Sequence, residues 1–333
     1  MSSLPAPRSS SREARPAGHD WHDEADRWWR DCQHAMRRWR RTLKSHLPYV
    51  RRREYARLNA KYAALSDAVG MGARHADDAQ IEARKPVTAP LAGEVCLFVS
   101  HQRGPALKTH VRAHIEQLLA HGVHVVLVLN ADDPGAPIAL DAALVERLGG
   151  LFVRENIGYD FAAWAHVHSL LRPWLDVSRL FLVNDSVVGP LDTLRFAALL
   201  RRIRASSADM LGLTEALTPR PHLQSYFLVF RRLIERSELT AFFDDVLCFA
   251  DKSTVIDAYE TRLTQRMRRA GYRCEALFPA LSSDPYASND TYFRWSELLD
   301  RGFPYVKASV LQEFGEHPRL HALAADKRHY FGR

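Results

Sequence analysis

Polar residues that can bind sugars, phosphates or metal ions follow four apolar stretches of this sequence. The clearest group is Asn184-Asp185-Ser186, which ends the apolar run "RLFLV" shortly before a turn at Gly189-Pro190. Similar groups end three earlier runs: Ser100-His101-Gln102-Arg103, Asn130-Ala131-Asp132-Asp133 and Arg154-Glu155-Asn156. Any one group could be an ordinary turn or helix cap. Four of them, each at the end of an apolar run, favour a shared binding site.

The segments that position these groups alternate between strand and helix patterns. Strands are predicted by continuous apolar runs at 95–101, 123–130, 151–156 and 179–185. Helices are predicted between them at 106–122, 142–150 and 159–175. Apolar strands joined by helices are typical of a parallel sheet with helices on both faces. In such a sheet the strands' carboxyl ends share one edge, and ligands bind there. We therefore expect an α/β fold with a ligand site along that edge.

Length and composition set the outer limits. The 333 residues, 47% of them hydrophobic, are enough for one large α/β domain with an appendage. No apolar run reaches the roughly 18 residues of a membrane span, and the first 20 residues lack the apolar core of a secretory signal. We therefore expect a cytoplasmic protein. The cysteines are far apart and fit reduced thiols better than a zinc site or disulfides: Cys32, Cys96, Cys248 and Cys274.

The net charge of +7 is concentrated near the N-terminus. Arginine, lysine and tryptophan dominate residues 21–60, and Asp31 is the lone acid between Arg27 and Arg53. The sequence predicts a disordered tail over 1–20, a basic, tryptophan-rich helical extension over 21–90 and the main domain over 91–333. Residues 21–60 could form a solvated packing helix, lie on the anionic inner face of the plasma membrane, or bind nucleic acid. Nucleic acid ranks last because no nucleic-acid-binding motif accompanies the charge.

Several enzyme classes are disfavoured by missing motifs. No G-x-G-x-x-G follows the first predicted strand, and no G-x-x-x-x-G-K-[ST] occurs, so the usual phosphate cradles are absent. The sequence also has no G-x-S-x-G nucleophile motif. What remains is a sheet whose strands end in amides and carboxylates, as in enzymes that use nucleotide-sugars. In those enzymes a strand-end aspartate holds the ribose or a divalent ion that neutralises the diphosphate.

Four blocks of the chain carry a family resemblance. They are "ENIGYDFAAW", "FLVNDSVVGPL", "DMLGLTEALTPRPHLQSYFLVFRR" and "WSELLDRGFPYVKASVL". In this order they resemble the rhamnan synthesis protein F family, bacterial polysaccharide-assembly proteins related to GT-A glycosyltransferases. The resemblance covers roughly residues 94–312. It implies a GT-A-like domain that moves a sugar, such as rhamnose or a related deoxysugar, from a nucleotide diphosphate donor to a lipid-linked surface glycan. One base acting directly would invert the configuration of the sugar.

The resemblance also assigns donor-binding residues. The first two strand ends would hold the nucleotide base and ribose through Ser100, His101, Arg103, Asn130 and Asp132. Asn156, Gly158 and Asp160 would begin a helix facing the donor, with Gly158 allowing close backbone approach. Asn184-Asp185-Ser186 would take the place of the DxD motif. With one carboxylate, Asp185 would be a weaker anchor for Mg²⁺ or Mn²⁺, whereas Asn184 and Ser186 could still bond ribose or diphosphate.

The second half supplies the expected base and acceptor residues. Residues 258–279 resemble the stretch of inverting GT-A enzymes in which an acidic residue begins a helix, so Glu260 would be the general base. Asp185 would be the second catalytic residue. A charge that merely suits the start of a helix is the competing interpretation for Glu260, and Asp257 and Asp290 are competing carboxylates. The acceptor site would include His222, Gln224 and Ser225. A different class of function stays open: a non-catalytic GT-A-like glycan-assembly protein whose degenerate DxD only binds.

Overall fold

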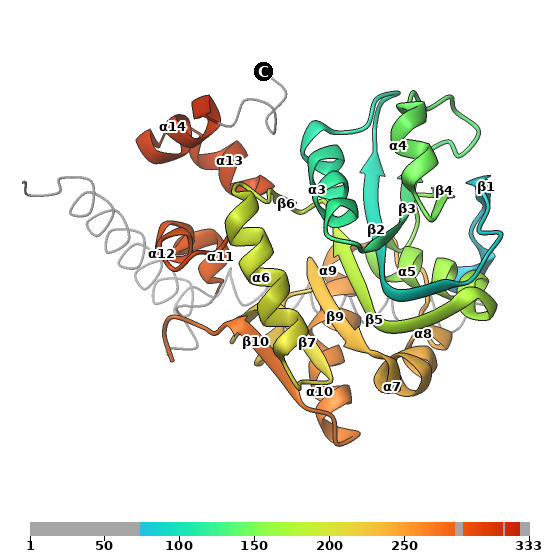
Figure 1. Ribbon diagram of the computed structural model, residues 1–333. Coiled ribbons are helices and arrows are strands. Elements are labelled where there is room, and N and C mark those ends of the chain that lie inside the picture. The colour runs from blue at the N-terminus through green and yellow to red at the C-terminus, as the bar shows by residue number, and fades with distance from the viewer. Residues whose placement is uncertain (1–73, 284–288, 316, 327–333) are drawn as a thin grey trace, which may run out of the picture. The chain divides into compact units, whose positions relative to one another are not determined.

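The computed structural model describes residues 74–283, 289–315 and 317–326 (Figure 1). The predictions for residues 1–73 lie outside them. The strands are β1 (Ile81–Lys85), β2 (Leu91–Gln102), β3 (His124–Ala131), β4 (Gly150–Glu155), β5 (Leu175–Asn184), β6 (Val187–Val188), β7 (Met210–Ala216), β8 (His222–Leu223), β9 (Phe227–Arg231), β10 (Cys274–Phe278) and β11 (Val306–Lys307).

The α-helices are α3 (Thr109–Ala120), α4 (Ala142–Arg147), α5 (Tyr159–Leu171), α6 (Thr193–Ala205), α7 (Arg232–Ile234), α8 (Thr240–Asp244), α9 (Lys252–Val255), α10 (Thr261–Arg269), α11 (Asp290–Phe293), α12 (Trp295–Asp300), α13 (Ala308–Phe314) and α14 (Pro318–Asp326). Short 3₁₀ helices are η1 (Ala76–Asp78) and η2 (Arg172–Trp174), and π-helical turns are η3 (Glu235–Leu239) and η4 (Ile256–Glu260).

The main sheet confirms an α/β fold with a mostly parallel central part. Its strand order is β1-β4-β3-β2-β5-β9-β7-β10, and β8 pairs with β7. The four predicted strands are β2, β3, β4 and β5, which lie side by side and parallel. In register, Asn184 pairs with Val99 and Asn130 pairs with His101. Their carboxyl ends therefore lie together, at what we call the carboxyl edge of the sheet.

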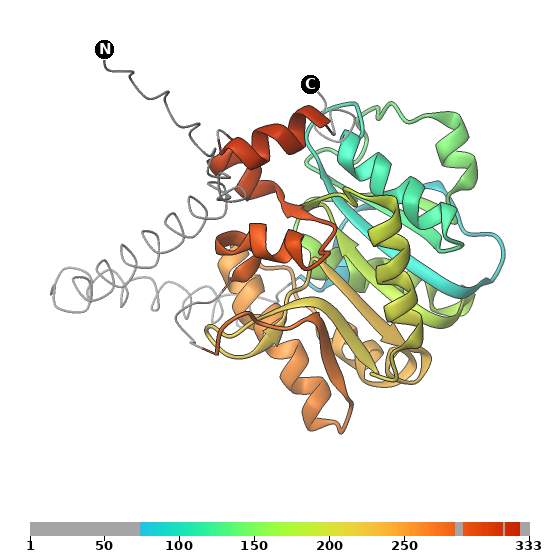
Figure 2. The same cartoon turned by 60° about the vertical axis from the view of Figure 1, so that its left-hand side comes forward.

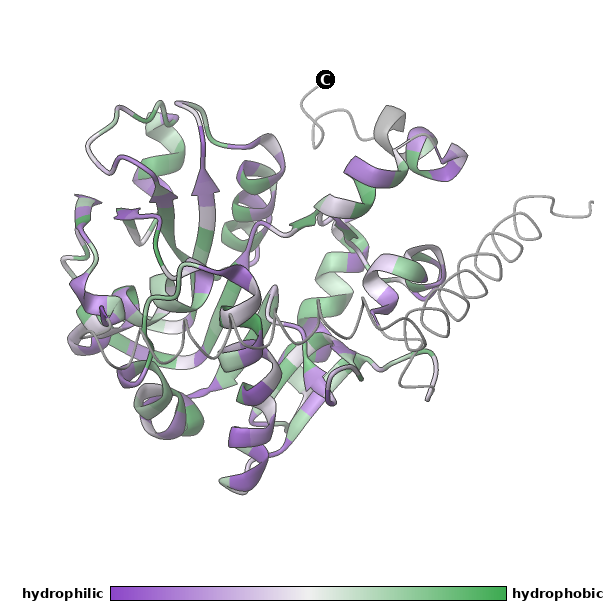
Figure 3. Ribbon diagram, turned by 180° about the vertical axis from the view of Figure 1, so that it is seen from behind, coloured by the Kyte–Doolittle hydropathy of each residue, from purple (hydrophilic) through white to green (hydrophobic). Residues whose placement is uncertain are grey.

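Helices cover both faces of this sheet (Figures 1 and 2). Alternate residues of a strand point to opposite faces, and β2 shows the consequence. Val95, Leu97 and Val99 pack in one buried cluster with α5, whereas Cys96 and Phe98 pack in another with α3 and α6. Figure 3 shows hydrophobic strand bodies changing to hydrophilic strand ends. The apolar runs thus reflect burial on both faces, and the polar groups begin where that burial stops.

One predicted boundary is wrong. The sequence predicts that the helical extension runs to residue 90, but β1 pairs antiparallel with β4 at the edge of the sheet. Ala76 and Ala79, just before β1, are already buried. An edge strand has one neighbour and needs little apolar surface, so "IEARK" gave no strand signal. The sheet domain therefore begins before residue 91.

A small sheet connects the end of β5 to the C-terminal part of the chain. After Asn184-Asp185-Ser186 the chain forms β6, which pairs antiparallel with β11 and places Lys307 opposite Val187. The segment around β11 shares a separate core with Leu191, next to α6 (Figure 2). This pairing brings Lys307 to the carboxyl edge. In the described residues, no helix combines the length and apolar character needed to cross a membrane.

Candidate functional site

Asp185 lies at the centre of the carboxyl edge, directly after β5. Its Oδ2 accepts hydrogen bonds from Ser100 Oγ at 2.7 Å and from the backbone N–H of His101 at 3.1 Å. The same oxygen accepts a hydrogen bond from Lys108 Nζ at 2.5 Å. Because β2 and β5 are parallel neighbours, the end of β2 supplies two of these donors. One oxygen of the carboxylate thus accepts from three donors, and 16% of the side chain is exposed.

Asn184 links this group to the start of α5. Its Nδ2 donates to Asp160 Oδ2 at 2.7 Å, and its Oδ1 accepts from the backbone N–H of Ser186 at 3.0 Å. Burial, and next the nearby charge of Asp185, raises the pKa of Asp160 to about 7. The ammonium of Lys252 and the bond from Asn184 oppose this shift. Asp160 therefore titrates near neutral pH, whereas an ordinary aspartate does so near pH 4.

A strained turn positions Asp160. Gly158 and Tyr159 both have left-handed backbone angles, with φ of 70° and 56°. A Cβ on Gly158 would lie 2.5 Å from that of Ala162 and 2.9 Å from the Cα of Cys248, so only glycine fits. Tyr159 is held by a 3.1 Å hydrogen bond from its hydroxyl to the carbonyl oxygen of Ala250. Left-handed tyrosine stores strain of the kind that clusters at functional sites.

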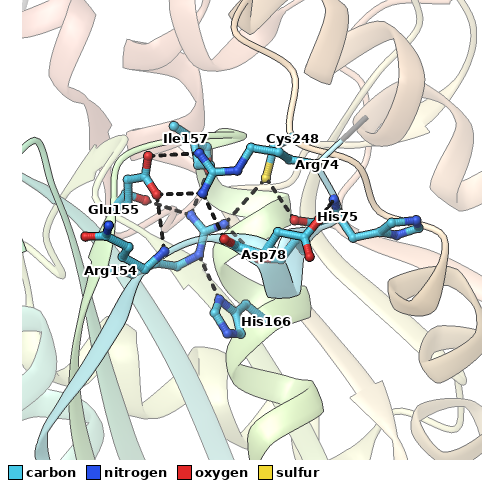
Figure 4. A network of polar contacts seen from close by, with 10 residues as sticks. Arg74, His75, Asp78, Arg154, Glu155, Ile157, His166 and Cys248 are labelled. Carbon is cyan, nitrogen blue, oxygen red and sulfur yellow. Dashed lines mark hydrogen bonds and ion pairs between the residues drawn. The ribbon is translucent and has the colours of Figure 1, made fainter. Parts of the chain in front are cut away.

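A buried arginine beneath this turn holds its backbone (Figure 4). Arg154 is completely buried, and all three of its side-chain nitrogens donate hydrogen bonds. The acceptors are the carbonyl oxygens of Ala76, Glu155 and Ile157, the Nδ1 of His166 and the sulfur of Cys248. The neighbouring Glu155 is paired instead with Arg74 at 2.9 Å. Arg154 thus fixes the loop between β4 and Gly158.

The expected donor residues gather at the ends of β2, β3 and β4. Asn156 Nδ2 donates to Asp132 Oδ1 at 2.9 Å and lies 3.0 Å from His101 Nε2. The bond from Asn156, together with the charges of His101 and Arg103, lowers the pKa of Asp132. Asn130 is buried, and its Oδ1 has no hydrogen-bond partner within the described part of the chain. An unpaired buried amide oxygen is a candidate ligand-binding atom because leaving it unpaired costs free energy.

Glu260 faces the same edge from the other half of the domain. Its Oε1 accepts a long 3.4 Å hydrogen bond from the backbone N–H of Ser225 and lies 3.8 Å from His222 Nε2. Its charge contributes to the raised pKa of Asp160 and opposes the burial that lowers the pKa of Lys307. The carboxylates of both halves of the domain are therefore close enough to interact.

Glu260 directly precedes α10, as the sequence predicts, but it does not lie at the start of the helical backbone. Helical backbone begins at Lys252 of α9, where Asp251 caps it by accepting from the backbone N–H of Thr254 at 2.8 Å, and continues through η4. Glu260 ends the π-helical turn η4 and so lies well inside this helical segment. The macrodipole therefore does not account for a carboxylate at this position. Single π turns inside helices are frequent at functional sites.

The other expected acceptor residues differ in how far their own chain engages them. The Nδ1 of His222 lies 2.7 Å from the carbonyl oxygen of Arg220, which leaves Nε2 toward Glu260. Gln224 is buried and bonded at both ends of its amide, to Thr214, Asn289 and Thr291. Asp290, a competing carboxylate, is also buried and accepts from the backbone N–H of Leu281 at 2.7 Å. His222 is thus placed to assist Glu260, and Gln224 supports the floor of the site.

The residues around Asp185 can be examined as possible ligands of the predicted metal ion. Within the described residues, no three histidine, cysteine, aspartate or glutamate side chains lie together as metal ligands would. At Asp185, one oxygen already accepts three hydrogen bonds, one of them from an ammonium. A divalent ion on Oδ2 would have to displace Lys108, so this oxygen is a poor metal ligand as it stands. Mg²⁺ or Mn²⁺ dependence stays a prediction.

Sequence reasoning missed one charged residue here and placed a second wrongly. Lys108 is the N-cap of α3, where a cation opposes the helix macrodipole, and that unfavourable residue is the available signal. Arg154 is among the predicted strand-end groups, but it is buried within β4 and bonds to its own chain, and a charge inside a buried strand is the signal for that role.

The fold and this edge define the class: an α/β protein with charged and amide side chains at the carboxyl ends of its parallel strands. The model of the family described as rhamnan synthesis protein F matches residues 139–326. Because the match covers more than half of the chain, this protein belongs to the rhamnan synthesis protein F family. The match includes Asp160, Asp185 and Glu260 but begins after Lys108.

Curated relatives add two further similarities. The virulence protein VirA of Vibrio anguillarum is 28% identical over 225 residues, which cover 57% of this chain and 70% of that protein. The uncharacterized protein y4gN of Sinorhizobium fredii is 30% identical over 204 residues, covering 59% of this chain and 50% of that protein. The family itself indicates a role related to polysaccharide biosynthesis.

Proposed function

We propose that this protein is a GT-A-like glycosyltransferase. It would move a sugar, rhamnose or a related deoxysugar, from a nucleotide diphosphate donor to a lipid-linked surface glycan. The observation that supports this most is the meeting of Asp160, Asp185 and Glu260 at one carboxyl edge, in a member of a polysaccharide-synthesis family. Such edges are where α/β proteins bind ligands.

In this proposal the chemistry is a direct displacement with Glu260 as general base. Its carboxylate takes the proton of an acceptor hydroxyl while the hydroxyl oxygen bonds to the anomeric carbon. The bond from that carbon to the donor phosphate breaks, and the nucleoside diphosphate leaves with the electron pair. His222, 3.8 Å from Glu260, would orient the carboxylate. Positioned bases of this kind contribute about 10²- to 10⁴-fold in rate.

A binding protein without catalysis is the second candidate. It is favoured by one observation: Asp185, in the DxD position, is engaged by Ser100, His101 and Lys108 of its own chain. A carboxylate committed in this way is less free to serve a donor. Glu260, with one long hydrogen bond to a backbone N–H, favours the enzyme.

Nucleotide-sugar binding and sugar transfer test these two candidates. The full chain would be heated with a panel of nucleotide-sugars, because a ligand at 100 times its dissociation constant stabilises by about 2.7 kcal/mol. The enzyme requires both a raised melting temperature and release of nucleoside diphosphate with a glycan acceptor present. Binding with no transfer to any acceptor tested, unchanged in Glu260→Gln, would indicate the binding protein. No shift with any donor would contradict both.

The basic segment 21–60 would place the enzyme at the anionic inner face of the plasma membrane. The reason for this proposal is the arginine and tryptophan content of the segment, which suits an interfacial helix. Full-length chain should sediment with phosphatidylglycerol vesicles, and a variant with its arginines between 27 and 53 changed to glutamine should not. Equal sedimentation of both would contradict this location.

A further inference from the structure

The ammonium of Lys108 has unused bonding capacity at the centre of the carboxyl edge. An ammonium carries three N–H donors, and in the described structure the hydrogen bond recorded for Nζ is the one to Asp185. The Lys108 side chain is 36% exposed. Two N–H groups therefore stay free for a ligand, while the bond to Asp185 fixes where the charge lies.

The surroundings of Lys108 favour an anion. The backbone N–H groups of the first turn of the 12-residue helix α3 follow it directly. Lys252 and Lys307 interact electrostatically with the same group of carboxylates, since Lys252 opposes the burial that raises the pKa of Asp160, and Glu260 opposes the burial that lowers the pKa of Lys307. Three lysine side chains therefore lie within electrostatic range of this group of carboxylates.

We infer that Lys108 forms the binding site for the donor's diphosphate and supplies the positive charge that a divalent ion supplies at a complete DxD motif. Asp185 is then a positioning residue: it holds the ammonium instead of a metal. As the bond to the sugar breaks, the departing diphosphate gains negative charge, and the free N–H groups of Lys108 donate to its oxygens. This inference rests on the proposed donor, but its anion site can be tested without sugar transfer.

The experiment measures the affinity of the full chain for UDP, dTDP, GDP and inorganic pyrophosphate by titration calorimetry, with EDTA or with Mg²⁺. The best nucleoside diphosphate should bind within about twofold under both conditions. Lys108→Met should weaken it about 10- to 100-fold, the loss of one or two charge-assisted hydrogen bonds, and Lys108→Arg should recover most of that loss. Binding of the matching nucleoside should change little. Arg147→Ala removes an exposed cation elsewhere and serves as the control.

Asp185→Asn tests whether Lys108 or a metal ion provides the positive charge that binds the diphosphate. Its amide oxygen can still accept from Ser100 and His101, so under our inference it weakens diphosphate binding less than Lys108→Met does. If a metal ion binds the diphosphate instead, Asp185→Asn weakens binding more than Lys108→Met does. EDTA then also weakens diphosphate binding to the wild type at least tenfold, and this result does not depend on whether any variant folds. Either of these results, or binding unchanged in Lys108→Met, overturns the inference. If pyrophosphate binding depends on Lys108 but no sugar is transferred, the anion site stands and the proposed enzyme activity is contradicted. If no diphosphate binds at all, the inference is contradicted.

Discussion

Two cations near the carboxyl edge, Arg154 and Lys108, illustrate opposite uses of charge. Arg154 is completely buried, and every side-chain nitrogen donates to its own chain. Lys108 is partly exposed, and one bond to Asp185 leaves two N–H groups free. Arg154 therefore holds the protein in shape, whereas Lys108 holds a charge ready for a ligand.

Two acidic residues, Glu235 and Glu260, differ in a similar way. Glu235 is 4% exposed and lies 2.8 Å from His168 in the core beneath α5. Glu260 has a long bond to a backbone N–H and faces the edge. In both pairs, one charge is buried with short contacts to its own chain and the other is more exposed at the edge. Removing the buried charges should affect stability, and removing the charges at the edge should affect binding and catalysis.

Glu260→Gln should have the largest effect. Glutamine keeps the shape and can still accept from Ser225 N–H, but it cannot take a proton. We expect the transfer rate to fall about 10³-fold, or about 4 kcal/mol in barrier height, with donor affinity nearly unchanged. The transfer rate is measured by the release of nucleoside diphosphate with a glycan acceptor present.

Glu235→Gln is the matched control for that prediction. It should lower the free energy of unfolding and leave the rate per folded molecule near wild type. Asp257→Asn and Asp290→Asn test the competing carboxylates. If either of these abolishes transfer while Glu260→Gln is active, the base is misassigned.

Arg154→Met should have the largest effect on stability. It leaves several carbonyl oxygens in the β4 loop without donors, and each unsatisfied buried group costs about 1–3 kcal/mol. We expect a loss of about 3 kcal/mol in the free energy of unfolding, measured by urea denaturation. Arg147→Ala, on the surface, should cost less than about 0.5 kcal/mol. A loss under about 1 kcal/mol for Arg154→Met would contradict its structural role.

The sequence predicts the central strands of this fold better than its edges. The four apolar runs became β2, β3, β4 and β5 because burial on both faces demands a continuous apolar pattern. β1 was missed because an edge strand has no such demand. The parallel order then brought Asn184, Asp185 and Ser100 together, as their strand-end positions implied.

The rest of the site depends on pairings that no local pattern encodes. Lys307 reaches the edge through β6 and β11, whose partners are more than 100 positions apart in sequence. Glu260 sits on a π turn, whose extra residue shifts the helical phase. The role of Asp185 depends on Lys108, which a strand-end inventory passes over.

Asp160→Asn should change how the free energy of unfolding depends on pH. The folded-state pKa of about 7 lies above the ordinary 3.8, so the unfolded chain releases its proton earlier. Stability contributed by this proton is present below about pH 4 and is lost as pH rises toward 7. Removing the charge should therefore raise the free energy of unfolding at pH 8 by about 1–2 kcal/mol, allowing for partial exposure, and hardly at all at pH 4.

Asp132→Asn is the opposite control for this experiment. The pKa of Asp132 is lowered, chiefly by the bond from Asn156, so any stability it adds is present at pH 8 and is lost as pH falls. Urea denaturation at both pH values compares the variants. An Asp160→Asn variant that gains nothing at pH 8 would show that its carboxyl is not destabilised in the folded protein.

Asp132→Ala should have the smallest effect on both stability and donor affinity. Asp132 is 80% exposed and is held by Asn156, so its carboxylate is available to a donor hydroxyl but makes little of the fold. We expect stability to stay near that of the wild type and donor affinity to fall about two- to fivefold, roughly the effect of one solvent-exposed hydrogen bond. Asp133→Ala is the matched control, because the neighbouring carboxylate accepts from the backbone N–H of Gly135 at 2.9 Å within its own loop. Calorimetric titration of both variants decides the point: equal losses would mean that the loop, and not the uncommitted carboxylate of Asp132, determines donor affinity.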